Sequence, residues 1–454
     1  MTKKYFGTDG IRGTANRFPM TADMALKVAM SAAIVLKSER NGKHQNRVVI
    51  GKDTRLSGYM LEQAMAAGFT AMGLDVILVG PIPTPGIAML TRSLRADMGV
   101  MISASHNPFQ DNGIKFFGAD GYKLSDELEV EIEAQIDKEI TDKELPPPDQ
   151  VGKAKRLEDA TGRYIEYIKR SFPRGKSLEG LKVVVDCANG AAYKVAPQIL
   201  WELEADVITI GNKPNGRNIN DGYGATATQR LQTAVVDHGF DVGIALDGDA
   251  DRLIVVDEKG TRIDGDQIMA LLAVQSKNEN MLNKDTVVAT VMSNLGLEKF
   301  LETQNIKLLR TPVGDRHVVE AMREGDYNLG GEQSGHLVLS DFGTTGDGTL
   351  AALQVLSILK DSDKPSSEIL SVFKPLPQVL KNVHYGSFKP LENKEILQEI
   401  EKAEKALANT GRMLVRLSGT EPVIRVMAEG EDQAFVESVV NDVCEMIEKL
   451  SKAS

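Results

Sequence analysis

Hydrophobic residues along the chain fall into two alternating patterns. Val48–Ile50 and Val76–Val79 are short continuous apolar runs, whereas Leu61–Met72 between them carries apolar residues at helical spacing. Such runs favour buried strands and such spacing favours an amphipathic helix, so the stretch predicts a β-α-β unit with a parallel sheet. The same order of patterns returns at residues 183–210 and 287–310. We interpret the repetition as one α/β module used three times.

A further strand pattern that ends in a polar loop follows each predicted unit. In each copy, the residue at the expected loop tip stands six residues after a glycine. These three residues are Ser105, Asp249 and His336. Hairpin-like stretches come next, at residues 114–121, 253–260 and 337–343. Because ligands bind outside the carboxyl ends of strands in open parallel sheets, three modules facing inward can present these loops to one shared site.

The C-terminal stretch departs from the repeat. Its predicted elements are a strand near 379–385, a helix over 395–407, a hairpin over 413–429 and a final helix over 433–450. Stretches that predict polar linkers are 146–155, 361–367 and 374–378. We therefore predict an α/β fold of three repeated modules with mixed, mainly parallel sheets, followed by a small α+β domain. The expected domains are 1–152, 153–255, 256–370 and 371–454.

Composition narrows the function classes. The 454 residues include 42% hydrophobic and 26% charged residues, which is typical of a globular chain. A formal net charge of -11 argues against a general nucleic-acid binder, so an anionic ligand must meet local positive charge. The two cysteines, Cys187 and Cys444, indicate neither a disulfide framework nor a zinc site. No stretch has the pattern of a signal peptide or of a membrane span, and we expect a cytoplasmic protein that binds no membrane.

Ser105 is the first candidate for chemistry. Val100–Ile102 predicts a buried strand that leads into the polar segment Ser103–Pro108. A serine hydroxyl is a poor nucleophile without a partner, and His106 or Lys115 can supply one. Serine, asparagine and proline are also common turn residues, so a plain strand-to-turn transition is the alternative. The threefold repetition favours the functional interpretation.

Two basic residues stand in glycine-containing loops. Arg12 lies in the segment Phe6–Gly13, where glycines let the backbone approach a ligand while a guanidinium points at it. Lys115 follows Gly113, and burial beside other charges is expected to lower its pKa into the range of a general base. An ordinary tight turn and a solvated lysine are the alternatives.

Asp247, Asp249 and Asp251 form the strongest local signal. These carboxylates alternate along the chain, and on extended backbone they would face the same side. Two unit charges ~4 Å apart repel by roughly 4 kcal/mol at an effective dielectric near 20, so the trio calls for a cation. Oxygen ligands of this kind suit Mg²⁺. The alternatives are a solvated acidic turn and an EF-hand loop, although Arg252 stands where that loop requires glycine.

A glycine-rich loop near residue 333 offers several polar groups. Glu332, Ser334 and His336 supply a carboxylate, a hydroxyl and an imidazole, which suit a polyhydroxy ligand such as a sugar. A polar loop that holds itself in shape through the glutamate and the serine is the alternative.

The predicted C-terminal hairpin carries a further loop with an arginine on each side. Arg416 and Arg425 flank a turn whose backbone N–H groups can form an anion nest. Because arginine supplies forked donors, this loop favours phosphate binding. The residues of the turn in that prediction are Ser418, Gly419 and Thr420.

Together these motifs resemble the α-D-phosphohexomutase superfamily over the whole chain. The segments that carry the likeness are 6–13, 103–108 and 331–336, and they most closely resemble the bacterial phosphoglucosamine mutase branch. Glucose and mannose phosphomutases usually carry a methionine where Gln333 stands. The resemblance implies four domains around a central cleft and a phosphorylated Ser105.

The resemblance also implies roles for the other candidates. The phosphate on Ser105 would complete the shell of one Mg²⁺ held by the three aspartates. Lys115 and His336 would act as acid and base, while Arg12 and Arg252 would neutralise the phosphoserine. Residues expected to hold the substrate are Glu332 and Ser334 at the sugar, and Arg416, Ser418, Gly419, Thr420 and Arg425 at the phosphate that is not transferred.

The implied reaction is the reversible conversion of glucosamine 6-phosphate to glucosamine 1-phosphate through a bound 1,6-bisphosphate, which feeds amino-sugar and cell-wall precursor synthesis. A phosphoglucomutase or phosphomannomutase, which differs only in the sugar, is the nearest alternative. A Mg²⁺-dependent sugar phosphatase and a phosphosugar sensor without turnover are further alternatives. Relatives suggest a homodimer.

Overall fold

The computed structural model describes residues 3–39, 45–385, 389–408, 410–417 and 423–453. The chain forms two compact units, of which the first holds Met1–Val291 with Leu309–Val372 and the second holds Met292–Leu308 with Phe373–Ser454. Among the helices within these described ranges, none has both the length and the apolar character that a membrane crossing requires.

The first sheet has the strand order β1-β2-β6-β5-β3-β4-β7. Its strands are β1 (Phe6–Gly7), β2 (Gly10–Thr14), β3 (Arg47–Lys52), β4 (Asp75–Pro81), β5 (Met98–Ile102), β6 (Asp111–Gly118) and β7 (Ala154–Arg156). Its helices are α1 (Ala22–Glu39), α2 (Ser57–Ala71), α3 (Thr84–Ser93) and α4 (Asp126–Ile136), with the short turn η1 (Pro148–Gln150) after them. β3, β4 and β5 run parallel, and β6 pairs antiparallel with β5.

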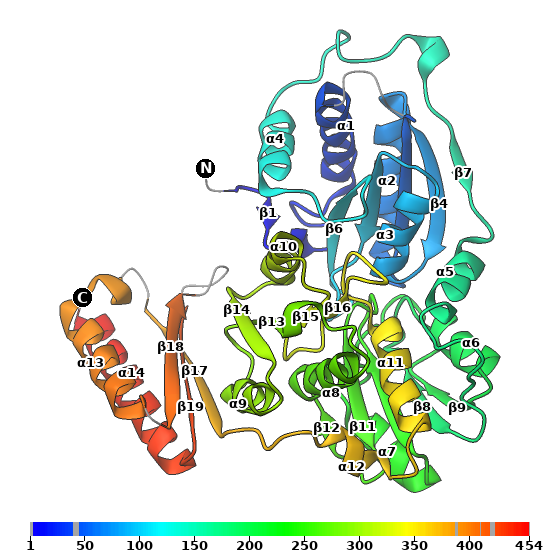
Figure 1. The fold of residues 1–454 in the computed structure, drawn as a ribbon. Helices are drawn as coiled ribbons and strands as arrows, with labels where there is room; N and C mark the ends of the chain where they lie inside the picture. Colours follow the sequence, from blue (N-terminus) through cyan, green and yellow to red (C-terminus); the bar gives the residue numbers. More distant parts are fainter. Residues whose placement is uncertain (1–2, 40–44, 386–388, 409, 418–422, 454) are drawn as a thin grey trace. The chain divides into compact units, whose positions relative to one another are not determined.

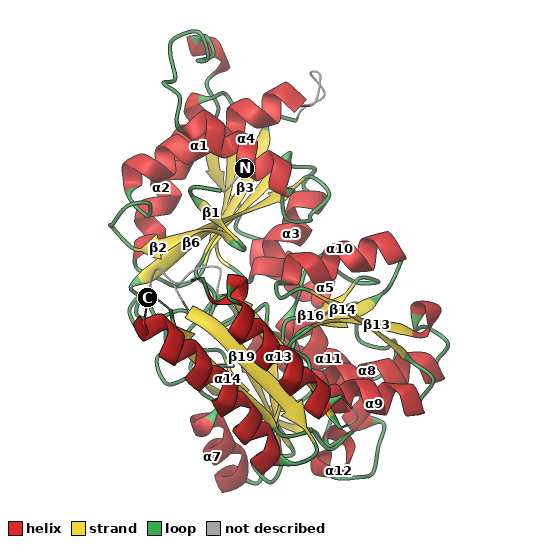
Figure 2. Cartoon of the chain, turned by 90° about the vertical axis from the view of Figure 1, so that its left-hand side faces the viewer, coloured by secondary structure: helices red, strands yellow, loops and turns green. Residues whose placement is uncertain are grey.

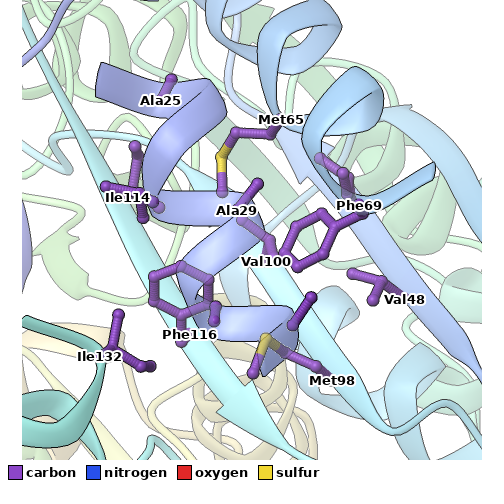
Figure 3. Close-up of a cluster of buried hydrophobic side chains, with 14 of the residues drawn as sticks. Ala25, Ala29, Val48, Met65, Phe69, Met98, Val100, Ile114, Phe116 and Ile132 are labelled. Carbon is purple, nitrogen blue, oxygen red and sulfur yellow. The ribbon is translucent and has the colours of Figure 1, made fainter. Parts of the chain in front are cut away.

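Helices cover both faces of this sheet. Figure 2 shows α1, α2 and α4 together on one side, with α3 on the other. The side chains of Met65, Phe69, Val100 and Phe116 meet in the core between the helices and the sheet (Figure 3). Because both faces are covered, every residue of β5 is buried, which explains the continuous apolar run that predicted this strand.

The second sheet follows the order β12-β11-β10-β8-β9 and the third the order β14-β13-β15-β16. Strands of the second sheet are β8 (Lys182–Asp186), β9 (Asp206–Ile210), β10 (Val242–Leu246), β11 (Leu253–Asp257) and β12 (Arg262–Ile263). Strands of the third are β13 (Thr286–Thr290), β14 (Lys307–Thr311), β15 (Leu329–Gly331) and β16 (Leu337–Leu339).

Helices link these strands in the same sequence as in the first sheet. They are α5 (Ala160–Lys169), α6 (Val195–Glu202), α7 (Gln229–His238), α8 (Gly265–Asn278), α9 (Leu295–Thr303), α10 (Asp315–Gly325), α11 (Gly348–Lys360) and α12 (Ser366–Leu370), with the short turn η2 (Asn283–Asp285). The strand orders β6-β5-β3-β4, β11-β10-β8-β9 and β16-β15-β13-β14 are equivalent, and each hairpin strand is antiparallel to its neighbour. The predicted threefold module is confirmed.

The segment predicted as a linker after Pro146–Pro148 contains a strand. β7 pairs in parallel with β4, and the Leu157 amide donates to the Leu78 carbonyl at 2.9 Å. The interpretation as a pure connector is therefore wrong at β7, because the backbone groups on the open side of β4 take up this segment. All three β7 side chains are exposed, so no hydrophobic pattern marks it. The exact domain boundaries stay a prediction.

The second unit contains the predicted α+β domain. Its antiparallel sheet has the order β17-β19-β18, and α13 and α14 pack against it (Figure 1). The elements are β17 (Gln378–His384), η3 (Pro390–Glu392), α13 (Lys394–Leu407), β18 (Gly411–Leu417), β19 (Val423–Gly430) and α14 (Gln433–Ala453). The segment before α9 joins this unit through side-chain bonds, since Arg412 donates to the Ser293 carbonyl at 2.7 Å.

The buried core of the first module gives a stability prediction. Phe69→Ala removes a fully buried ring from α2, and we expect a loss of about 3–5 kcal/mol in the free energy of unfolding. Urea titration followed by circular dichroism measures the loss. Trp201→Ala, at a side chain that is 72% exposed, is the control and is expected to change little. Equal losses in the two variants would contradict the assignment of this core.

Candidate functional site

Ser105 lies in the loop that joins β5 to β6. It is buried and adopts φ +51°, a left-handed conformation that costs roughly 1–2 kcal/mol in a residue with a β-carbon. Its hydroxyl donates to Asp247 Oδ2 at 2.6 Å, so the serine of the first module meets the acidic loop of the second. The predicted convergence of these two loops is confirmed.

The three aspartates come together through a turn. The Ala250 amide donates to the Asp247 carbonyl at 3.0 Å, and Ala250 has φ +58°. The expectation of extended backbone is therefore wrong, because a tight turn aims the three carboxylates at one point. All three are buried, which overturns the solvated acidic turn. Strands rather than helices flank the loop, which overturns the EF-hand alternative.

This acidic loop fits a divalent cation. One oxygen from each of Asp247, Asp249 and Asp251 lies within 4.8 Å of the others. Among the described residues, Asp249 Oδ1 and Asp251 Oδ1 are buried without a hydrogen-bond donor, so each has a lone pair to offer. Burial, reinforced by the two neighbouring carboxylates, raises the pKa of Asp247 well above its ordinary value. A cation would relieve this repulsion, and the all-oxygen donor set suits Mg²⁺.

Lys115 projects from β6 toward the same carboxylates. Its Nζ lies 2.9 Å from Asp249 Oδ2, 3.1 Å from Asp9 Oδ2 and 3.6 Å from Asp251 Oδ2. Burial alone would lower the pKa of Lys115, but these three carboxylates outweigh it and raise the pKa above its ordinary value. The expectation of a lowered pKa is therefore wrong: in the metal-free chain this lysine carries its proton.

His106 stands beside the serine. Its Nδ1 lies 3.4 Å from Ser105 Oγ. Burial lowers the pKa of His106 to about 4, and the cationic Arg252 and Arg12 act in the same direction. The imidazole is therefore neutral near pH 7 and has a nitrogen lone pair to accept a proton. This agrees with its prediction as one possible partner of the serine.

Arg12 and Arg252 both act on this cluster. Arg12 binds Asp9, and Asp9 also contacts Lys115 and Lys123. Burial opposes ionisation of Asp9, but Lys115, Lys123 and Arg12 hold its pKa well below the ordinary value. The Arg252 amide donates to Asp247 Oδ1 at 3.2 Å, while its side-chain Nε is buried without an acceptor among the described residues.

The third loop meets the second one directly. The Leu253 amide donates to the Gly335 carbonyl at 2.9 Å, and a β-carbon on Gly335 would lie 2.1 Å from the Leu253 carbonyl oxygen. His336 Nδ1 lies 3.7 Å from Asp251 Oδ2, and its Nε2 lies 3.6 Å from Asp315 Oδ2. Burial opposes protonation, but these two carboxylates raise the pKa of His336 to about 9.

Glu332 and Ser334 hold one another. Ser334 Oγ donates to Glu332 Oε2 at 3.2 Å, and the Gly314 amide donates to Glu332 Oε1 at 3.1 Å. The alternative of a polar loop that holds itself in shape through the glutamate and the serine is therefore met in part. Both side chains remain partly exposed and have further hydrogen-bonding capacity, which a ligand with hydroxyl groups can use.

The predicted phosphate residues belong to the second unit. Arg416 and Arg425 lie opposite one another on β18 and β19. Arg425 Nε is buried with no acceptor in the described part of the chain, and burial together with the neighbouring Arg425 charge lowers the pKa of Arg416. Two facing cations of this kind suit an anion. Ser418, Gly419 and Thr420 lie outside the described residues.

The sequence reasoning missed several residues that shape the site. Thr84, at the start of α3, donates to Asp249 Oδ2 at 2.6 Å. Lys123 links Asp9 to Asp315, which in turn faces His336. Asp9 stands inside the glycine-rich segment that drew attention to Arg12, and that proximity was the one available signal. Asp315 lies in a charged segment just before the third loop, whereas Thr84 reaches the site only through the fold.

Comparison with known proteins supports this arrangement. Models of phosphoglucomutase/phosphomannomutase α/β/α domains I, II and III match residues 3–143, 162–260 and 264–376, and the model of the C-terminal domain matches residues 380–446. The chain belongs to the phosphoglucomutase/phosphomannomutase family. The predicted resemblance, the fold class and the classification as a phosphohexomutase-type isomerase are thereby confirmed.

Relatives within this family are similar over their whole length. A phosphoglucosamine mutase of Parvibaculum lavamentivorans is 60% identical over 448 residues, which cover 99% of either chain. One from Agrobacterium fabrum is 60% identical and covers 100% of both chains. Among solved structures, a phosphoglucomutase/phosphomannomutase family protein from Burkholderia thailandensis shares the fold at 23% identity, with a TM-score of 0.81 and coverage of 100% of this chain and 98% of its own.

The raised pKa of Asp247 predicts that metal binding releases protons. A carboxylate must lose its proton to bind a cation, so Mg²⁺ affinity is expected to fall as the pH is lowered. Since the folded-state pKa of Asp247 exceeds its unfolded value, this group stabilises the metal-free protein at low pH and destabilises it as the pH rises. Isothermal titration of the metal-free protein with Mg²⁺, in two buffers that differ in ionisation enthalpy, measures the release.

The same site predicts a thermal shift. At a Mg²⁺ concentration of about 100 Kd, binding stabilises the native state by roughly 2.7 kcal/mol. Asp249→Asn is expected to remove most of this rise in Tm, whereas Asp206→Asn, at an exposed carboxylate of the same module, should preserve it. An unchanged Mg²⁺ response in Asp249→Asn would rule out this metal site.

Proposed function

We propose that this chain interconverts glucosamine 6-phosphate and glucosamine 1-phosphate through a phosphorylated Ser105. The observation that carries the chemistry is the Ser105 hydroxyl, 2.6 Å from Asp247, beside two buried aspartate oxygens without hydrogen-bond donors. The choice of sugar is supported by relatives named phosphoglucosamine mutase that are about 60% identical over the whole chain. A solved N-acetylphosphoglucosamine mutase of Aspergillus fumigatus, in complex with GlcNAc-6P and magnesium, shares the fold at 17% identity and a TM-score of 0.70, and covers 99% of this chain and 96% of its own.

In the forward direction two different phosphoryl groups are transferred, one in each of two steps. The bond from phosphorus to Ser105 Oγ breaks as a bond to the sugar O1 forms, which yields a 1,6-bisphosphate. After the intermediate has turned, the bond from phosphorus to O6 breaks and the bond to Ser105 Oγ forms again. Phosphoryl transfer depends mainly on positioning and charge neutralisation, and the buried loop around Ser105 supplies both.

Basic residues neutralise the transferred group in this proposal. Arg12, Arg252 and the protonated Lys115 surround the acidic loop and stabilise charge that develops on the phosphoryl oxygens. Lys115 carries its proton and acts first as the acid, at the oxygen that leaves phosphorus. The sugar O1 hydroxyl loses its proton as it bonds to phosphorus, and we assign that proton to His336 in its neutral form, because Asp251 and Asp315, which raise its pKa to about 9, make it a strong proton acceptor.

We assign the binding of the cation that the reaction requires to the three aspartates. Asp247, Asp249 and Asp251 would hold one Mg²⁺, with Ser105 or its phosphate as a further ligand. When bound, this ion draws negative charge from the phosphoryl oxygens. Thr84 and Lys115 bind one oxygen of Asp249, so the other oxygen stays directed at the cation position.

The remaining assignments concern the substrate. Glu332 and Ser334 bind sugar hydroxyls, and Arg416 and Arg425 bind the phosphate that is not transferred, together with Ser418, Gly419 and Thr420. We propose a cytoplasmic site of action, where phosphosugars are found. The alternative substrate class is a glucose or mannose phosphate, which differs from glucosamine phosphate only around C2 of the sugar.

The proposal predicts a defined outcome for Ser105→Ala. Loss of the phosphoryl carrier is expected to reduce turnover of glucosamine 6-phosphate by at least about 10³-fold, a scale typical of removing a covalent nucleophile. Ser93→Ala, at an exposed serine of the same module, is the control and should retain activity. Peptide mass spectrometry of the wild-type protein should place a phosphate on Ser105.

Substrate comparison decides between the alternatives. Glucosamine 6-phosphate, glucose 6-phosphate and mannose 6-phosphate are assayed side by side, with free phosphate measured in each reaction. We expect the highest kcat/KM for glucosamine 6-phosphate and almost no phosphate release. A large preference for glucose or mannose would shift the assignment to that sugar, and steady phosphate release would indicate a phosphatase.

A further inference from the structure

Arg55 is a fully buried arginine on the segment that follows β3. All five of its guanidinium N–H groups are directed at acceptors around the Ser105 loop. Nε donates to Asp53 Oδ2 at 2.8 Å, and Nη2 donates to the carbonyls of Ser105 at 2.9 Å and Asn107 at 2.8 Å. Nη1 donates to the carbonyls of Pro108 and Asp111. One side chain therefore binds four backbone carbonyls, three in the Ser105 loop and one at the first residue of β6.

A second chain of bonds reaches the same loop from Asp53. Its carboxylate accepts from the Arg55 amide at 2.9 Å and from Ser103 Oγ at 2.7 Å. Ser103 Oγ in turn accepts from the Ser105 amide at 2.9 Å. Both the amide and the carbonyl of Ser105 are thus tied to the pair of Asp53 and Arg55. These ties act on the residue that has the left-handed backbone.

The second module adds a matching contact. Asn220 Nδ2 donates to the Ser105 and Asn107 carbonyls, each at 2.9 Å, which are the two acceptors of Arg55 Nη2. A β-carbon on Gly248 would lie 2.5 Å from the Ser105 carbonyl oxygen, so the acidic loop also closes on it. The Ser105 carbonyl is therefore enclosed by both modules.

We propose that Arg55, together with Asn220, is a positioning residue that holds Ser105 in its left-handed conformation with the hydroxyl on Asp247. This inference rests on the proposed phosphoryl-carrier role of Ser105. Arg55 itself is fully buried behind the loop, and its donors are all used by protein acceptors, so it acts through Ser105 and not on the substrate. Lysine cannot reproduce its planar set of donors.

The expected signature is a loss in kcat without a matching change in KM. Misplacing a reacting group by about 1 Å costs up to roughly 100-fold, so Arg55→Lys is expected to lower kcat with glucosamine 6-phosphate by about 10- to 100-fold. KM should stay within about threefold, because no substrate contact is removed. Asn220→Ala should also lower kcat at nearly unchanged KM, but by a smaller factor, since Arg55 still binds both carbonyls.

Hydrogen exchange supplies a readout that does not depend on activity. The peptide covering residues 103–111 is expected to exchange faster in Arg55→Lys and in Asn220→Ala than in the wild-type protein, while peptides from α1 and β8 keep their rates. Arg47→Lys is the matched control: Arg47 is the first residue of β3, the strand before the Arg55 segment, and donates to the Leu94 carbonyl at 2.7 Å. It should leave kcat, KM and this exchange rate unchanged.

The outcomes separate this inference from the proposed function. If the wild-type protein lacks mutase activity, the proposed function fails, and exchange of residues 103–111 alone tests the positioning role. If the wild-type protein is active and both variants fold with kcat within threefold of it, the inference is overturned. A rise in KM at unchanged kcat overturns it too. Should Arg55→Lys fail to fold, Asn220→Ala, at a partly exposed side chain, still decides.

Discussion

Mutual repulsion among three buried carboxylates is the constraint on which the site depends. Asp247, Asp249 and Asp251 bring their oxygens within 4.8 Å of one another in a place from which water is largely excluded. Burial and the neighbouring carboxylates raise the pKa of Asp247, whereas Lys115 and His336 outweigh burial at Asp251 and hold its pKa below the ordinary value. The first module offsets this repulsion with hydroxyl donors and positive charge: Ser105 and Thr84 each donate at 2.6 Å, and Lys115 donates at 2.9 Å. The acidic loop therefore needs its neighbours before it can be stable.

The threefold repeat explains how those neighbours arrive. Each module places a loop at the carboxyl end of its central parallel strand, β5, β10 or β15, just before the antiparallel hairpin strand. The repeated topology delivers three loops of different chemistry: a serine, a carboxylate cluster and an imidazole. Under the proposed function, one structural plan would supply a phosphoryl carrier, a cation site and a proton-transfer group through loops of different residues.

Hydrophobic pattern predicted much of the repeated fold, because strands such as β3, β8 and β13 are largely buried and appear as continuous apolar runs, whereas β15 was indicated by its glycine spacing. It failed at β7, whose side chains are all exposed and whose pairing rests on backbone bonds alone. Within the site, residue type and repetition identified Ser105, the three aspartates and His336. The turn at Ala250 and the charged state of Lys115 could not be predicted, since one depends on local backbone geometry and the other on Asp249 and Asp9, each more than a hundred residues away in the sequence.

The backbone junction between the second and third loops has a consequence for how this family diversifies. Leu253 and Gly335 are joined by a hydrogen bond, and their close approach excludes any side chain at Gly335. The acidic loop and the loop assigned to the sugar are therefore connected through their backbones. Any replacement of residues 331–336 that puts a side chain at position 335 would therefore displace Leu253 and, with it, the neighbouring aspartates to which we assign the cation.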